Sequence, residues 1–327
     1  MAMSFYLPLL IPHFQRIAIG ETLTSLWSGC GQIVKCQLDE QACVIKAIKV
    51  PDHINHPKIK QSSFALTRKR DSYHVEYTFY QQFSHKLPKQ AAAIECIKAI
   101  NKGDEFALVF KDFSKLGYTQ ATTENIKAIL KWLGQFHAFH LNAFHLNAFH
   151  LNTKFDGLWP QGSYWHLDTR PDEFNNLPEK SDIKQAATQL NNALKQCDYQ
   201  TLIHGDAKLA NFAANSQGHI LGYDFQYVGA GVGVVDVMYF MTSCMDDSEL
   251  HKHAQTYLDY YFSQFKNALS HYQPAVNADD VIAQWAHLWP VAWADFYRFL
   301  LGWSPEHKKI NGYMQAQVNN WLASNNS

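Results

Sequence analysis

The first third of the chain alternates short apolar runs with turns, which is the pattern of antiparallel strands. The runs are rich in Val, Ile, Leu and Thr, and glycine or polar residues separate them. The predicted strands span residues 22–29, 33–38, 42–50, 91–99 and 105–113. The segment 71–87 instead places Val75, Phe79 and Phe83 at helical spacing and is followed by Pro88, so it predicts a helix. This part of the chain therefore predicts a small antiparallel sheet accompanied by one helix.

Beyond residue 118 the apolar positions follow helical spacing. Helices are predicted at 126–140, at 181–197 after a capping Ser181, and over most of 248–327. The connection 153–180 is rich in Trp, Pro, Gly and Asp and is predicted to be irregular. We therefore expect an α+β protein of two lobes, a strand-rich lobe over 1–113 and a larger, mainly helical lobe over 114–327. A hinge is predicted near 110–117.

The five-residue segment AFHLN occurs three times in tandem, at 138–142, 143–147 and 148–152. On an α-helix, a period of five advances by about 140° per repeat, so the repeated side chains rotate around the axis. We interpret the repeat as a sequence expansion that lengthens the helix or its exit loop. The alternative is a metal site formed by the three repeated histidines, His140, His145 and His150, although no single helix face gathers them.

The composition of the chain argues against some classes of partner and identifies none. The chain has 327 residues, 47% hydrophobic and 17% charged, with a net charge of −1, which suits a globular protein with sizeable cores. This balance offers no electrostatic reason to expect a nucleic-acid partner or an anionic membrane surface. No apolar run approaches the roughly 18 residues of a membrane span. The six cysteines form no CxxC pair, so we expect reduced thiols and a cytoplasmic protein.

The stretch 201–226 carries the most specific chemical signal. It places Asp206 and Asn211 five positions apart, and Asp224 follows eighteen positions after Asp206. Short apolar runs precede both acids, so a β-hairpin could return Asp224 beside Asn211. Two carboxylates and one amide offer the oxygen ligands that Mg²⁺ prefers. We therefore predict a phosphoryl-transfer site, in which Asp206 accepts a hydroxyl proton and the amide and second carboxylate hold Mg²⁺ against a nucleotide.

Residues of the first lobe could complete such a site, although each also has a structural interpretation. The Gly29–Gly31 turn could cover phosphates or be an ordinary hairpin turn. Lys46, in an apolar strand, could face a phosphate or lie at an edge, and Lys49, three residues later on the opposite face, is the backup candidate. Glu76 could orient Lys46 or act as a helix-dipole partner.

Two further segments of the first lobe could contact a ligand. The backbone of the hinge, at Phe110 and Asp112, could bind the edge of an adenine. The basic run that includes Arg68, Lys69 and Arg70 is predicted to be a solvated loop, with anion contact as the alternative.

The motifs HGDAKLAN and YDFQ resemble the catalytic and metal loops of the aminoglycoside phosphotransferase and choline kinase superfamily, which has the protein-kinase-like fold. With SLWSGCGQIVKCQL, VIK, SYHVEYTFY and LVFKDF, the pattern is most similar to the ecdysteroid kinase-like branch, over roughly residues 20–240. The chain departs from the pattern in having only Gly-x-Gly in its turn, in DFQ instead of DFG, and in the AFHLN repeat.

The resemblance assigns a role to each residue of the motifs. It implies that Asp206 is the catalytic base and that Asn211 and Asp224 are Mg²⁺ ligands. It further implies that Lys46 contacts the α- and β-phosphates and pairs with Glu76. Two more assignments follow from the same resemblance: Lys208 reaches the γ-phosphate, and Asp236 braces the loop.

The expected activity is an ATP- and Mg²⁺-dependent transfer of the γ-phosphate to a hydroxyl of a small molecule. The late aromatic residues favour a neutral or amphipathic acceptor, although Asp246, Asp247 and Glu249 could line an acidic cleft. The alternative is a nucleotide-binding pseudokinase without turnover. A protein kinase is disfavoured because nothing after Asp224 resembles an activation segment. The sequence does not predict the oligomeric state.

Overall fold

The computed structural model describes residues 4–26, 29–51, 63–141 and 155–325. Its first lobe is a five-stranded antiparallel sheet in the order β1-β2-β3-β5-β4. The strands are β1 (Ile17–Ser25), β2 (Gly31–Leu38), β3 (Gln41–Lys49), β4 (Cys96–Lys102) and β5 (Glu105–Lys111). The predicted sheet is thus confirmed, with β1 beginning earlier than expected because Ile17 and Ala18 already pair with β2.

Both faces of the sheet are buried at β5, which explains why β5 is a continuous apolar run. Alternate residues Ala107 and Val109 pack with the short helix α1 (Leu7–Leu10) in one cluster. The residues between them, such as Leu108, join the main core instead. Lys46 follows Ile45, which belongs to the first cluster, so its side chain points to the face that α2 covers.

Helix α2 (Ser63–Gln82) is longer than predicted, and the basic run at its start is not a solvated loop. Arg68 donates to the carbonyl oxygen of Thr169 at 2.5 Å, and Lys69 donates to Oε1 of Gln226 at 3.2 Å. Because no glycine or proline interrupts 63–71, the helix can extend through this segment, and acceptors in the second lobe satisfy its cations. The rest of the predicted loop, 52–62, lies outside the described residues.

The second lobe is mainly helical and contains two small sheets, as predicted for an α+β protein. Its helices are α3 (Ile126–His140), α4 (Pro171–Asn175), α5 (Asp182–Gln185), α6 (Ala187–Lys195), α7 (Gly233–Cys244), α8 (Asp247–Tyr272), α9 (Ala278–His287), α10 (Trp289–Trp303) and α11 (Gly312–Asn325). Strand β7 (Thr201–Ile203) pairs with β10 (Gly229–Gly231), and β8 (Phe212–Asn215) lies between β6 (Tyr118–Gln120) and β9 (Ile220–Gly222). Short 3-10 turns include η4 (Phe113–Leu116) and η7 (Leu209–Asn211).

The predicted helix at 181–197 needs correction, and most of the AFHLN repeat lies outside the described residues. The predicted helix 181–197 is two helices, α5 and α6, and the Ser181 hydroxyl donates to the carbonyl of Pro178 instead of capping the helix. The first AFHLN copy ends α3, where His140 Nδ1 contacts the Phe136 carbonyl oxygen at 2.9 Å. Residues 142–154, with His145 and His150, lie outside the described residues.

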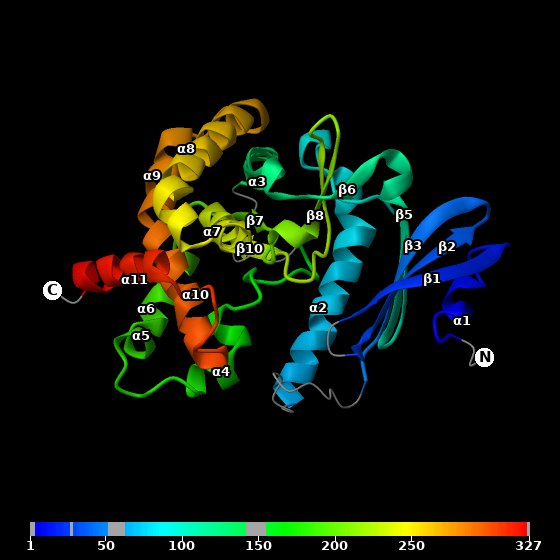
Figure 1. Ribbon diagram of the computed structural model, residues 1–327, viewed down its shortest axis with the longest axis horizontal. Helices are drawn as coiled ribbons and strands as arrows, with labels where there is room; N and C mark the ends of the chain where they lie inside the picture. Colours follow the sequence, from blue (N-terminus) through cyan, green and yellow to red (C-terminus); the bar gives the residue numbers. More distant parts are fainter. Residues whose placement is uncertain (1–3, 27–28, 52–62, 142–154, 326–327) are drawn as a thin grey trace.

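The two lobes lie side by side, with the sheet at one end of the molecule and helices α8–α11 at the other (Figure 1). Helix α2 and the hairpin β8–β9 lie between them. The chain crosses between the lobes after β5, through η4 and a left-handed Gly117 (φ 79°). The fold class is therefore confirmed as bilobal α+β. In the described ranges, no helix is long and apolar enough to cross a membrane, and the six cysteines form no disulfide.

His166 is buried in this lobe, and neither ring nitrogen has a hydrogen-bond partner among the described residues. Burial lowers the pKa of His166 from 6.5 to about 3, so the folded state favours the neutral ring. The stability that this ring contributes is present above its ordinary pKa and is lost as pH falls toward the folded pKa. We expect the free energy of unfolding to drop by about 2 kcal/mol between pH 7 and pH 5 through this group.

Urea denaturation of the wild type and of His166→Phe at both pH values measures this drop. The variant should lose about 2 kcal/mol less on acidification, whereas replacement of the exposed His85 by Gln should change nothing. Equal acid sensitivity of the wild type and His166→Phe would contradict the interpretation.

Candidate active site

The predicted catalytic loop begins where the buried strand β7 ends, and the pairing of β7 with β10 fixes the position of that end. Gly205 has a left-handed φ of 77°, and a Cβ there would overlap the carbonyl oxygen of Tyr227. Only glycine fits this turn without displacing the backbone. The turn places Asp206, which is 8% exposed, at the mouth of the loop.

Asp236 holds this loop through hydrogen bonds to its backbone. Its Oδ2 accepts from the His204 amide at 2.6 Å, and its Oδ1 accepts from the Gly205 amide at 2.9 Å. His137 Nε2 also contacts Oδ2 at 3.1 Å, and the ring is held in turn by the Tyr261 hydroxyl at 2.9 Å from Nδ1. The carboxylate lies within α7, whose N-cap is Val232, so Asp236 braces the loop and does not cap the helix.

Replacing Asp236 with Asn should cost about 2–4 kcal/mol in the free energy of unfolding, because the amide cannot accept from all three donors and they are buried. The same change at the exposed Asp259 is the matched control and should cost less than about 0.5 kcal/mol. Urea denaturation of both variants measures the difference. A cost at position 236 no larger than at 259 would show that the loop does not depend on this carboxylate.

Asp206 is surrounded by donors. Lys208 Nζ lies 3.0 Å from its Oδ2, and Asn211 Nδ2 donates to the same oxygen at 3.1 Å and to the Asp206 carbonyl at 2.8 Å. Burial raises the pKa of the Tyr239 hydroxyl, from α7, and the nearby Asp206 carboxylate adds to that rise. The predicted grouping of Asp206, Lys208 and Asn211 is therefore present.

His204 is a neutral part of this framework. Its Nε2 lies 3.0 Å from the Tyr223 carbonyl oxygen and so carries the proton, while Nδ1 accepts from the Asp206 amide at 3.3 Å. Burial lowers the pKa of His204, which is consistent with that uncharged tautomer. The ring thus connects the catalytic loop to the residue that precedes Asp224.

The hairpin β8–β9 returns Asp224 to the loop as predicted. The Tyr223 amide donates to the Asn211 carbonyl at 3.0 Å, which places the next residue, Asp224, beside Asn211. Asp224 has a left-handed φ of 67°, a conformation that aspartate adopts more readily than most residues. Its Oδ1 faces the first lobe, where Lys46 Nζ lies at 2.6 Å.

Lys46 connects both lobes. Its ammonium contacts the two Glu76 oxygens at 2.8 and 2.7 Å as well as Asp224, and the Lys46 and Glu76 side chains are only 9% and 1% exposed. Burial alone would lower the pKa of Lys46, but the carboxylates of Asp224 and Glu76 outweigh it and raise the pKa. Burial raises the pKa of Glu76 to about 7, with Lys46 opposing the shift. The backup candidate Lys49 lies on the other face, paired with Glu105 at 2.7 Å and largely exposed.

The donor set fits Mg²⁺. Among the described residues, no hydrogen bond occupies Asn211 Oδ1 or Asp224 Oδ2, since the contacts of these side chains run through Nδ2 and Oδ1. Mg²⁺ usually takes only one or two ligands from the protein when nucleotide phosphates and water complete its coordination shell, and one amide with one carboxylate meets that need. The same described residues contain no cluster of three His, Cys, Asp or Glu side chains that could hold a metal.

Gln226 occupies the position of the glycine in a DFG motif, and its side chain makes contacts that the sequence did not predict. Its Nε2 donates to Asp224 Oδ1 at 2.5 Å, and its Oε1 accepts from Ser72 Oγ at 3.3 Å and Lys69 Nζ at 3.2 Å on α2. Its carbonyl oxygen accepts from the Trp159 indole at 2.8 Å. Gln226 therefore joins the candidate metal ligand to the helix that carries Glu76. The departure from DFG was the available signal.

The backbones of the glycine turn and of the hinge are held by local contacts. Gly29 donates to the Leu26 carbonyl within the turn, and a Cβ at Gly31 would overlap the Ala47 carbonyl oxygen on β3. Phe110 is paired on both sides within the sheet. The Asp112 amide donates to the Ala42 carbonyl, its carboxylate accepts from the Ser114 amide at 3.0 Å, and its carbonyl oxygen accepts from the Lys115 amide at 3.1 Å. An adenine contact at this residue would therefore need the second lone pair of that carbonyl oxygen.

Aromatic and cationic side chains surround the other side of Asp206. Tyr239 contacts Tyr164, and Arg170 lies over the Tyr164 ring at 5.5 Å. Lys309, from the loop between α10 and α11, lies over the Tyr239 ring at 4.2 Å and over Phe296 at 5.4 Å. The sequence predicted aromatic residues here only in general, and no motif singled out Lys309.

The three acids that could have contributed to an acidic cleft have other partners. Asp246 and Glu249 form the capping box of α8, and Asp247 accepts from the Tyr313 amide at 2.8 Å. Their oxygens serve helix ends, as expected for acids in a first helical turn.

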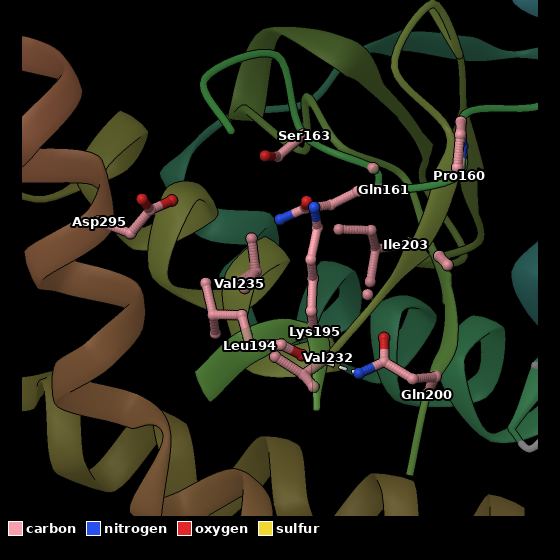
Figure 2. A pocket seen from close by; sticks show the side chains of 13 residues that line it. Pro160, Gln161, Ser163, Leu194, Lys195, Gln200, Ile203, Val232, Val235 and Asp295 are labelled. Atoms are coloured by element: carbon pink, nitrogen blue, oxygen red, sulfur yellow. Dashed lines mark hydrogen bonds between the residues drawn. The ribbon is translucent and has the colours of Figure 1, made fainter. Parts of the chain in front are cut away.

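A cavity of about 240 Å³ lies behind the catalytic loop (Figure 2). Asp295 reaches toward it from α10 on one side, and Ile203 of β7 lies on the other. Lys195 and Gln161 also line it, and Gln161 Oε1 is buried without a partner in the described chain. None of the candidate catalytic residues lines this cavity, so it is separate from the reacting groups.

Comparisons with known proteins agree with this geometry. Residues 166–273 match the model of the ecdysteroid kinase-like family. No curated protein sequence matches the chain significantly. Two solved structures similar to the whole chain are a microcompartment-associated aminopropanol kinase (13% identity, 96% of this chain and 92% of that chain, TM-score 0.50) and an amicoumacin kinase in complex with AMP-PNP (14% identity, 98% and 93%, TM-score 0.50).

At such low identity, these structures establish the fold, and the family match covers the segment that holds the catalytic loop, the hairpin and α7. The predicted fold is therefore confirmed as the one that these two kinases share, and the resemblance inferred from the motifs is confirmed over residues 166–273, which match the ecdysteroid kinase-like family model.

Proposed function

We propose that the protein is an ATP- and Mg²⁺-dependent phosphotransferase that phosphorylates a hydroxyl of a small molecule. The observation that carries this proposal is the convergence of two lobes on one site. Lys46 and Glu76 from the first lobe meet Asp224 from the second, which the hairpin places beside Asn211 and the Asp206 loop. Such an arrangement positions phosphates and a hydroxyl, which is most of what phosphoryl transfer requires.

In this reaction Asp206 accepts the proton of the acceptor hydroxyl as the hydroxyl oxygen forms a bond to the γ-phosphorus. The bond from that phosphorus to the bridging oxygen breaks, and ADP leaves. In this proposal Lys208, at 3.0 Å from Asp206, contacts the γ-phosphate, and Lys46 contacts the α- and β-phosphates. Mg²⁺ would supply charge neutralisation on the phosphate oxygens, held by Asn211 Oδ1 and Asp224 Oδ2.

The remaining assignments extend the same proposal. The turn at Gly29 and Gly31 covers the phosphates, and the backbone at Phe110 and Asp112 binds the adenine edge. The lobes divide at residues 113 and 114, and the enzyme works in the cytoplasm.

The test separates an enzyme from a nucleotide-binding pseudokinase. Thermal unfolding is measured with ATP, with Mg²⁺ and with both together, and ADP formation is then measured across a broad panel of alcohols. Stabilisation by Mg²⁺ and ATP together, with ADP formed only when an alcohol is present, supports the phosphotransferase. Stabilisation without turnover on any alcohol favours the pseudokinase, and no stabilisation contradicts both.

A further inference from the structure

Lys309 lies on the acceptor side of the candidate site. It belongs to the loop between α10 and α11, outside the segment that matches the family model. Its ammonium lies 4.2 Å from the centroid of the Tyr239 ring, and the hydroxyl of that tyrosine lies close enough to Asp206 for the carboxylate to add to the rise that burial causes in its pKa. The Lys309 ammonium is thus one aromatic ring away from the proposed base.

This ammonium lacks a carboxylate partner in the part of the chain that the structure describes. The aromatic rings of Tyr239 and Phe296 attract the positive charge, but they leave its N–H donors without an oxygen acceptor. Burial lowers the pKa of Lys309 to about 8, with Asp206 acting in the opposite direction. A half-buried ammonium with unused donors has a strong need for an oxygen acceptor.

The surroundings strengthen the positive potential at this place. Lys208 and Lys308 are the neighbouring cations that lower the pKa of Lys309 further, and Cys244 is the other titratable neighbour besides Asp206. Asp206 itself is already engaged by Lys208 and Asn211. The three acids that could have contributed to an acidic cleft, Asp246, Asp247 and Glu249, have their contacts at the start of α8 instead. A cationic acceptor would therefore meet repulsion here.

We propose that Lys309 determines acceptor specificity, and that the acceptor carries a carboxylate or similar oxyanion near the hydroxyl that is phosphorylated. The proposal rests on the proposed function, because it names the substrate class of the same site. The oxyanion accepts the free donors of Lys309, while an apolar or aromatic part of the acceptor packs beside Tyr239 and Phe296. Amino alcohols and polycationic acceptors are disfavoured.

The experiment uses three aromatic alcohols that share one skeleton and differ in charge. The probes are para-(hydroxymethyl)benzoate, para-(hydroxymethyl)benzamide and para-(aminomethyl)benzyl alcohol. Their binding to the full chain with Mg²⁺ and AMP-PNP is followed by NMR titration. We expect the benzoate to bind at least about tenfold more tightly than the amine. Equal or tighter binding of the amine, or no measurable binding of the benzoate at millimolar concentration, would overturn the proposal.

Variants assign the preference to one side chain. Lys309→Met should weaken binding of the benzoate by about 10- to 100-fold and leave the amine unchanged or tighter, and Lys309→Arg should restore the preference. Lys102→Met, at an exposed lysine on β4 of the first lobe, is the control and should keep wild-type selectivity. If Lys309→Met keeps the preference for the benzoate, the proposal fails. A merely structural role would weaken all three probes alike.

The same samples distinguish this proposal from the proposed function. Stabilisation by Mg²⁺ and ATP tests the nucleotide site, whereas the ranking of the three probes tests Lys309. If the wild type shows no nucleotide stabilisation, the proposed function fails, whatever the ranking. If nucleotide stabilisation is present and the ranking is absent or reversed, only the inference about Lys309 fails.

Discussion

Replacing Asp206 with Asn is expected to reduce phosphoryl transfer by about 10²- to 10⁴-fold, because the amide cannot accept the proton of the acceptor hydroxyl. Asparagine keeps the size of the side chain and one oxygen, so the contacts with Lys208 and Asn211 can largely persist. The fold and the affinity for Mg²⁺ and ATP should therefore stay close to wild type. Steady-state ADP formation with the active alcohol measures the first effect, and thermal shift with nucleotide measures the second.

The control for this variant is the same change at Asp280, an exposed residue in the first turn of α9. It should leave turnover within about twofold of wild type, since the substitution lies at the surface. Undiminished turnover in Asp206→Asn would remove Asp206 from the role of base. A loss of nucleotide stabilisation in Asp206→Asn would instead indicate that the residue supports the metal site.

Lys46→Met should have the second large effect, because it removes a phosphate contact and the positive charge between two carboxylates. We expect a loss of about 3 kcal/mol in the free energy of unfolding, since Glu76 then stays buried without its partner. The affinity for ATP and the rate of turnover should each fall by at least about tenfold. Urea denaturation and nucleotide thermal shifts measure the two losses separately.

Lys49→Met is the matched control, since it removes an exposed lysine from the same strand, paired with Glu105 on the opposite face. Its cost should stay below about 1 kcal/mol. Adding Glu76→Gln to Lys46→Met should recover part of the stability and none of the activity, because the buried charge is gone but the phosphate contact is still missing. A Lys46→Met protein as stable and active as Lys49→Met would contradict both parts of the prediction.

The candidate site was largely predictable wherever it depends on local spacing. Asp206 and Asn211 come together because five residues form one loop, and Asp224 joins them because a hairpin has few ways to close. The sheet was predictable because turns separate its apolar runs. Asp236 could be interpreted either as a cap or as a brace until the amides it accepts from were known.

The features that the sequence did not predict depend on tertiary contacts. The sequence at the basic start of α2 resembles that of a solvated loop, but its cations donate to acceptors in the second lobe, as Arg68 does to the Thr169 carbonyl oxygen. Serine is a residue type that often caps helices, but the Ser181 hydroxyl donates to the nearby Pro178 carbonyl oxygen instead. Lys309 lies more than a hundred residues after Asp206, and only the packing of its loop onto Tyr239 brings the two together.

The bridge through Gln226 has a consequence for protein engineering. Its amide contacts Asp224 on one side and Ser72 on the other, so one side chain serves both the metal ligand and the interface between the lobes. A chimera that took its first lobe from a relative would lose the Ser72 contact while keeping every residue of the catalytic loop. Grafts of this kind should therefore transfer Ser72 and Gln226 as a unit, even though 154 positions separate them in the chain.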